Sequence, residues 1–280
     1  MIKYSCNVNW KGRKYMSYRF TFPEGKDKAL TFSYDDGNIA DKRLVSIFNN
    51  YGLKATFHLN SGMLDGKGFI KKKEIKDLYK GHEIAGHGVH HEFMNDLHNE
   101  AVVREIIEDR RVLENYNDSI VVGYSYPYGQ YNKSLIDKLK VLGIQYSRTV
   151  NSTRNFFIPG DFMQWNPTCH HNDVTDEMIE DFFNPPSYRE LSLFYIWGHS
   201  FEFDRENTWD RFEQICDKLH GKNDVWYTTN FEFKEYFSAI RSVVTNVDDN
   251  KVYNPTGQVI WLINNNKLMR LLPGQIMLVK

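Results

Sequence analysis

The chain has 280 residues, of which 41% are hydrophobic, so it can bury a large core. Its 35 Lys and Arg balance 36 Asp and Glu and are scattered along the chain, which excludes the basic surface that nucleic acid requires. No apolar run reaches the roughly 18 residues of a membrane span, and the N-terminus holds no signal-like stretch. We therefore expect a cytoplasmic enzyme with no nucleic-acid or membrane partner, although a chain trimmed of an export signal would look the same.

The N-terminal segment, residues 1–27, contains apolar side chains at every second position from Met16 to Phe22. Such alternation predicts a strand, and Pro23 and Gly25 end it. We expect this strand to lie on the edge of the main body.

From Lys28 onward, short apolar strands alternate with amphipathic helices. After a first strand that ends at Asp35-Asp36-Gly37, strands are predicted at 54–60, 82–86, 119–124, 144–150, 191–197 and 225–228. Helices are predicted at 39–50, 71–80, 99–116, 133–142, 175–183, 207–220 and 231–242. Repeated strand-then-helix order favours a parallel sheet, and seven or eight units favour its closure. The predicted fold class is α/β, a distorted (β/α)7–8 barrel over residues 28–242.

Two parts of the chain depart from this order. Residues 151–173 are rich in Asn, Pro and His, and we expect a long functional loop with one short strand near 162–165. Residues 243–280 hold two apolar runs, 259–263 and 267–272, on either side of three Asn. They predict a small β-hairpin appendage that covers the barrel or, alternatively, binds a partner.

Three cysteines, Cys6, Cys169 and Cys216, lie far apart in the chain. Their odd number and their spacing argue against a disulfide framework and against a zinc knuckle. We expect ordinary thiols.

Two adjacent acids, Asp35 and Asp36, follow the first strand. Alone, Asp-Asp-Gly is more often a turn than a site. Two carboxylates at one strand end repel each other, however, unless a cation or different roles separate their protonation states. His87 and His91 follow another strand and are four residues apart, a spacing that lets both imidazoles share a metal while His90 points elsewhere. Two His and one carboxylate leave a coordination position open, which suits a catalytic metal.

The sequences Thr31-Phe32-Ser33-Tyr34-Asp35-Asp36-Gly37 and His87 to His91 resemble the first two motifs of the polysaccharide deacetylases, the NodB-homology domains of carbohydrate esterase family 4. The resemblance spans roughly residues 28–240. It implies that Asp35 is the general base and that Asp36, His87 and His91 hold a divalent metal, zinc or alternatively cobalt or nickel.

The third family motif, Arg-x-Pro-Tyr or Phe, is matched by Ser125-Tyr126-Pro127-Tyr128, which lacks the arginine. The resemblance implies that the backbone N–H of Tyr128 helps to stabilise the oxyanion. We hypothesise that Arg148, at the tip of the neighbouring predicted strand, supplies the missing guanidinium from another position.

The fourth motif is matched by Asp161 and Trp165, and the fifth by Trp197-Gly198-His199. The resemblance implies that His199 is the general acid that protonates the leaving amine, a task that suits an imidazole. It also implies that Trp165 walls the pocket. We expect Asp161, Trp197 and His171 to contact substrate as well, whereas Glu202 and Asp204 are interpreted as an acidic loop.

The predicted reaction is metal-dependent hydrolysis of the N-acetyl amide of an amino sugar, in a monomeric or polymeric carbohydrate, to acetate and a free amine. One alternative is hydrolysis of another amide, such as a cyclic imide or a ureide, because relatives of this fold without the motif-three arginine act on substrates other than sugars. A second alternative is a carbohydrate-binding relative without catalysis. The sequence does not predict the oligomeric state.

Overall fold

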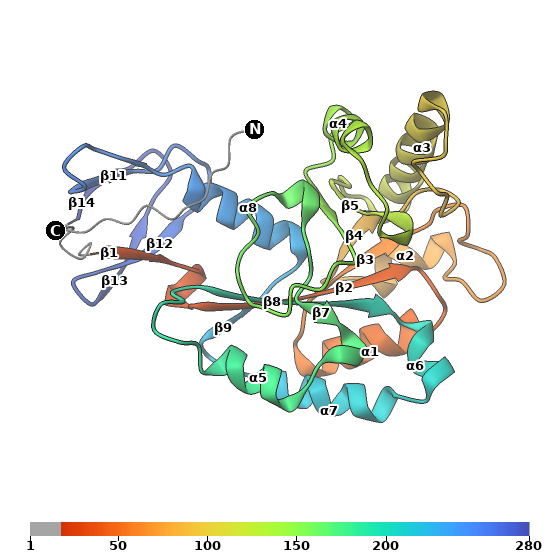
Figure 1. The fold of residues 1–280 in the computed structure, drawn as a ribbon, viewed down its shortest axis with the longest axis horizontal. Helices are drawn as coiled ribbons and strands as arrows, with labels where there is room; N and C mark the ends of the chain where they lie inside the picture. Colours follow the sequence, from red (N-terminus) through yellow and green to blue (C-terminus); the bar gives the residue numbers. More distant parts are fainter. Residues whose placement is uncertain (1–17, 280) are drawn as a thin grey trace. The chain divides into compact units, whose positions relative to one another are not determined.

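The computed structural model describes residues 18–279, which form two compact units (Figure 1). The larger unit is Lys26–Glu235, and the smaller one joins the described residues up to Gly25 to those from Tyr236 onward. The boundary falls inside helix α8, Asn230–Arg241. Among residues 18–279, no helix is long and apolar enough to cross a bilayer. Cys6 and Met16 lie outside the described residues.

The larger unit is built on a curled sheet in which every strand pair is parallel. The strand order is β6-β5-β4-β3-β2-β8-β7, and β9 pairs with the start of β2. The strands are β2 Lys28–Asp36, β3 Ala55–Leu59, β4 Glu83–Gly86, β5 Gly123–Ser125, β6 Tyr146–Arg148, β7 Cys169–His170, β8 Ser192–His199 and β9 Val225–Tyr227.

One short segment joins the two edges of this sheet. Trp165 forms a bridge with Arg148 of β6, and four residues later Cys169 pairs with Ile196 of β8. The seven-strand path is therefore closed by irregular backbone rather than by a regular eighth strand. The predicted α/β class and distorted (β/α) barrel are confirmed.

Helices cover the outside of the sheet, and α1, α5 and α7 lie together along one side of β2 and β8 (Figure 1). The helices of the larger unit are α1 Asp41–Tyr51, α2 Ile75–Leu78, α3 Asn99–Asn117, α4 Lys133–Val141, α5 Asp176–Phe183, α6 Phe201–Glu206 and α7 Trp209–Leu219, followed by α8. α1 ends where Gly52 takes a left-handed conformation, φ 63°, which glycine adopts without strain.

Strand β2 shows why the barrel has a polar interior and an apolar outside. Successive side chains of a strand point to opposite faces. Phe32 contacts Phe48 of α1 on the outer face, at 4.8 Å between ring centroids. On the inner face, Thr31 bonds to the Asn230 side chain at 2.9 Å and Asp35 to Ser125. The strand therefore carries a carboxylate into the barrel while its alternate residues anchor the core.

Several predicted elements differ from the structure. Residues 162–164 form a 3-10 turn and not a strand, and the strand of this region is β7. The predicted acidic loop after His199 is helix α6. Only Ile75–Leu78 of the predicted helix 71–80 is α-helical, and a 3-10 turn precedes it. These errors share a cause. In a short element the apolar residues repeat too few times to distinguish the period of a helix from that of a strand.

The buried face of α3 does not follow its apolar residues alone. Val103 is 36% exposed. The buried positions are Val102, Glu105, Ile106, Asp109 and Leu113. Apolar residues alone do not predict this buried face, because two of its five residues, Glu105 and Asp109, are acidic.

The smaller unit contains two three-stranded antiparallel sheets. One holds β1 Tyr18–Thr21, β12 Ile260–Asn264 and β13 Lys267–Leu271, and the other holds β10 Val244–Thr245, β11 Lys251–Tyr253 and β14 Ile276–Leu278. The predicted hairpin is β12–β13, and positive φ at Asn265 and Asn266 gives its tight turn. The placement of the N-terminal strand on the main body was wrong, because β1 pairs with β12.

Candidate metal centre and active site

The C-terminal ends of the parallel strands gather the predicted site residues at one edge of the barrel. Asp35 of β2 is in register with His199, the last residue of β8. Ser125 ends β5 and Arg148 ends β6, in register with each other, and His87 follows directly after β4. Parallel strands present their C-terminal ends on the same side, which is where barrel enzymes build their sites.

Asp36, His87 and His91 form a group of possible metal ligands. Asp36 Oδ1 lies 3.7 Å from His87 Nε2 and 3.8 Å from His91 Nε2. This Oδ1 atom is buried and has no hydrogen-bond partner among the described residues. Donor atoms in a tetrahedral zinc site with bonds of about 2.1 Å lie about 3.4 Å apart, so the three residues fit one divalent ion.

Hydrogen bonding prepares His87 for this role. Its Nδ1 lies 2.9 Å from the carbonyl oxygen of Ser125, so Nδ1 carries the proton and the lone pair of Nε2 faces Asp36. Burial lowers the pKa of His87 to about 3, although the charge of Asp35 acts in the opposite direction. The imidazole is therefore neutral near pH 7, the form that binds a metal.

A buried carboxylate of α3 holds the loop that carries His87. Asp109 Oδ2 accepts hydrogen bonds from the backbone N–H groups of His87 at 3.0 Å and Gly88 at 3.1 Å. Its Oδ1 accepts from the N–H of Ser61 at 2.9 Å. Burial raises the pKa of Asp109 to about 7, and the three N–H donors oppose this shift. Asp109 therefore fixes the backbone on which the first histidine ligand is placed.

A second carboxylate of α3 turns His90 away from the site. Glu105 accepts from the His90 backbone N–H at 2.9 Å and lies 2.7 Å from its Nδ1. His90 thus points elsewhere, as its position between the two ligands predicted. Glu105 and Asp109 were not predicted, but their i, i+4 spacing on the apolar face of α3 was a usable signal.

Asp35 Oδ2 lies 3.8 Å from His87 Nε2, but unlike Asp36 this carboxylate also has partners outside the histidine pair. Its Oδ2 bonds to Arg148 Nη2, and its Oδ1 accepts from Ser125 Oγ at 3.3 Å. Although burial acts to raise it, the pKa of Asp35 is held well below its ordinary value by Arg148 and nearby imidazoles. Arg148 is buried and its guanidinium lies 4.4 Å from the ring centroid of Trp197. The guanidinium of Arg148 therefore lies beside the carboxylate of Asp35, and its role in place of the motif-three arginine stays a prediction.

His199 is joined to Glu202 at the start of α6. Its Nδ1 lies 3.3 Å from Glu202 Oε2, and its backbone N–H donates to the same oxygen at 3.1 Å. Burial opposes a positive charge here, but the Glu202 bond and the charges of Asp35 and Asp36 raise the pKa of His199. The imidazole therefore keeps its proton to higher pH than a free histidine. Glu202 was missed because it was interpreted as part of a solvent-exposed loop.

Tyr128 lies beside the metal cluster and forms an aromatic surface with Phe93. Its backbone has a positive φ of 57°, which turns the chain after Pro127. Its ring centroid is 4.4 Å from that of His91 and is stacked on Phe93 at 3.8 Å. Both aromatic side chains are exposed, at 51% and 41%. An exposed aromatic pair next to the cluster suits a sugar ring.

Two residues expected to contact substrate, Trp165 and His171, are buried, whereas Asp161 is exposed. Trp165 is fully buried and packs against Tyr195 inside the barrel, so it does not wall an open pocket. Asp161 is exposed and caps the 3-10 turn that follows it by accepting from the Met163 N–H. His171 is 1% exposed. Trp197 is also nearly buried and contributes by contacting Arg148.

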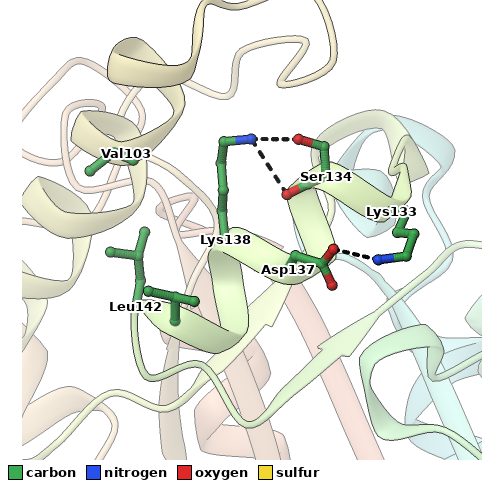
Figure 2. A pocket seen from close by; sticks show the side chains of 7 residues that line it. Val103, Lys133, Ser134, Asp137, Lys138 and Leu142 are labelled. Carbon is green, nitrogen blue, oxygen red and sulfur yellow. Dashed lines mark hydrogen bonds and ion pairs between the residues drawn. The ribbon is translucent and has the colours of Figure 1, made fainter.

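A separate hollow of about 510 Å³ lies between α3 and α4 (Figure 2). Its polar side chains already pair with each other, since Lys133 bonds to Asp137 at 2.7 Å and Lys138 to Ser134. The lining shares no residue with the cluster at the strand ends: it consists of Val103, Lys133, Ser134, Asp137, Lys138, Val141 and Leu142. We do not place the active site there.

The family model described as polysaccharide deacetylase matches residues 23–147. Over these residues the chain is similar to the polysaccharide deacetylases. The match contains Asp35, Asp36, His87, His91 and Tyr128, and it ends one residue before Arg148. The region of the fourth and fifth motifs lies beyond it.

The polysaccharide deacetylase homologue YxkH of Bacillus subtilis (strain 168) is 24% identical over 127 residues, which are 44% of this chain and 45% of that protein. The chain therefore spans less than half the length of this relative. A polysaccharide deacetylase homologue from Mycobacterium smegmatis superposes with a TM-score of 0.57 at 18% identity, covering 79% of this chain and 93% of that one. The peptidoglycan deacetylase PdaC of Bacillus subtilis, in a substituted form, gives 0.51 at 18% identity over 78% and 94%. At these identities the two structures establish the fold.

Proposed function

We propose that this protein hydrolyses the N-acetyl group of an amino sugar in an oligosaccharide or polysaccharide. The observation that carries this proposal is that two adjacent acids have different partners. Asp36 faces His87 and His91, whereas Asp35 is bound by Arg148 and Ser125. This arrangement suits a metal-dependent hydrolase in which one carboxylate is a metal ligand and the next one takes a proton.

Asp36 Oδ1, His87 Nε2 and His91 Nε2 would hold a divalent cation, zinc or alternatively cobalt or nickel. When bound, the cation would lower the pKa of a water molecule and polarise the amide carbonyl. The remaining steps belong to side chains and backbone of this chain.

Asp35 accepts the proton of the attacking water. The contact with Arg148 keeps the carboxylate ionised, and this also makes it a weak base. Proton transfer to such a base is efficient only from an acidified water, so Asp35 and the metal ligands depend on each other. Arg148 takes over, from a different strand, the position of the arginine that the third motif lacks.

His199 donates a proton to the departing nitrogen as the C–N bond breaks and acetate forms. Glu202 engages Nδ1, so Nε2 is the nitrogen that gives up the proton. We assign the Tyr128 backbone N–H to the developing oxyanion. The exposed pair Phe93 and Tyr128 favours a sugar ring over a small imide, because it offers a flat apolar surface beside the ligands.

The test is acetate release from chitooligosaccharides by zinc-loaded protein, compared with hydrolytic ring opening of small cyclic imides and ureides to their amide or ureido acids. We expect acetate release, and we expect D35N to bind zinc normally while turnover falls about 10²- to 10⁴-fold. A zinc-replete D35N protein with near-normal rates would contradict the base assignment. Turnover of imides alone would replace the sugar substrate by the alternative amide, and no turnover of any substrate by the loaded protein would favour a binding protein.

A further inference from the structure

We propose that His170, His171 and Glu202 form a second divalent-cation site. Their donor atoms all lie within 4.8 Å of one another. Glu202 Oε2 is 2.9 Å from His170 Nε2 and 3.6 Å from His171 Nε2. These separations bracket the distance of about 3.4 Å between ligands of one tetrahedral zinc ion.

His171 provides independent support, because its surroundings give it no other role in hydrogen bonding. The ring is 1% exposed and is stacked on Phe203 at 4.2 Å, with Tyr34 on it at 5.7 Å. Neither ring nitrogen has a hydrogen-bond partner among the described residues. A buried imidazole without partners is costly. A cation between Nε2 and Glu202 would remove this cost at Nε2.

Gly198 of β8 leaves room for the His171 ring. A Cβ at Gly198 would lie only 1.9 Å from His171 Nδ1, so only glycine at this position admits the imidazole. The contact fixes the Nδ1 edge against β8 while Nε2 faces Glu202. The orientation of the ring is thus built into the backbone.

His170 makes the second site weaker than the first. Its Nδ1 accepts from the Asn172 N–H at 3.3 Å, so the proton of the neutral ring is on Nε2, the atom nearest Glu202. Coordination through Nε2 moves this proton to Nδ1 and breaks a long hydrogen bond. Arg205, with Nη2 at 3.3 Å from Glu202 Oε1, also opposes a cation. Two imidazoles and one carboxylate favour zinc, cobalt or nickel over magnesium or calcium.

The second ion has a consequence that rests on the proposed function. Glu202 Oε2 also accepts the backbone N–H of His199 at 3.1 Å and lies 3.3 Å from His199 Nδ1. A cation on this oxygen competes with His199 for it and disturbs the orientation of the proposed acid. Cation in excess of the first equivalent should therefore inhibit acetate release.

The experiment is a titration of the chelator-stripped full chain with ZnCl2 or CoCl2, in which calorimetry and metal analysis count the ions. We expect two zinc ions per chain in the wild type, the second bound at least 10-fold more weakly. H170A should bind one, H91A should bind one, and H220A, a substitution of a histidine outside both clusters, should bind two. E202Q removes the carboxylate ligand and should also bind one, which covers the case that H170A fails to fold.

One ion in the wild type, or two ions in both H170A and E202Q, overturns the second site. An H91A protein that binds none also overturns it, because the second site must bind without the first. These counts do not depend on catalysis, so a protein with two ions and no deacetylase activity would refute the proposed function and leave the second site standing. In the active protein, H170A should retain a larger fraction of its own activity in excess zinc than the wild type does.

Discussion

The loop after β4 and the segment between β6 and β8 both bring histidines to the same edge of the barrel, but they are held in different ways. The first loop is short and its backbone N–H groups bond to Asp109. The second segment is long, crosses from one edge of the sheet to the other, and buries Trp165 and His171. In the first region, local backbone geometry fixes the positions of the histidines, so motif spacing predicts them. In the second region, packing against residues distant in the chain fixes these positions, so motif spacing does not.

Among the residues that support the site, the largest effect is expected from R148M, which removes the charge beside Asp35 at the end of β6, where the second region begins. Loss of the guanidinium raises the pKa of Asp35 and leaves its buried carboxylate poorly compensated. We expect kcat/KM for acetate release to fall about 10²- to 10³-fold while zinc is retained. Normal turnover with an unchanged acidic limb of the pH profile would remove Arg148 from the mechanism.

D109N tests the first region. An asparagine can present an amide N–H₂ to N–H groups that need an acceptor, so the loop carrying His87 loses its support. We expect zinc affinity to fall about 10- to 100-fold, as when groups that hold a metal ligand in place are replaced. The matched control is E108Q on the same helix, because Glu108 is exposed and pairs with Arg111 on the surface of α3. Equal affinities in the two variants would mean that the loop holds itself in place.

E202Q changes the pH dependence through His199. The pKa of His199 is raised, so its acid form persists to higher pH and activity is lost as pH rises through that pKa. Removal of the Glu202 charge lowers this pKa, so the alkaline limb of kcat/KM should move to lower pH by about one unit. The profile should be measured at one zinc equivalent. An alkaline limb at the wild-type position would show that another group is the acid.

The smallest effect is expected from D161A. Asp161 matches a family motif, yet in the structure it is an exposed cap of a 3-10 turn. Loss of the cap should cost about 1 kcal/mol of unfolding free energy in denaturant titrations and leave KM unchanged. A KM that rises several-fold with unchanged stability would restore Asp161 to the substrate site.

The sequence by itself predicted the barrel and the residues at its strand ends, because the patterns that indicate them are local in the chain. Strand-then-helix periodicity predicted the barrel, and a strand that ends in two acids predicted where Asp35 and Asp36 lie. The spacing of His87 and His91 is a property of one short loop. These features need only the geometry of a strand end or of a few peptide units.

Only the tertiary structure shows which side chains hold these reactive residues in place. Glu202, Asp109 and the buried positions of Trp165 and His171 depend on elements that meet across the barrel. A carboxylate is normally expected at the surface, and only its partners can make burial favourable. Those partners are distant in the chain, so the sequence specifies the reactive groups while the packed fold decides how each of them is charged and held.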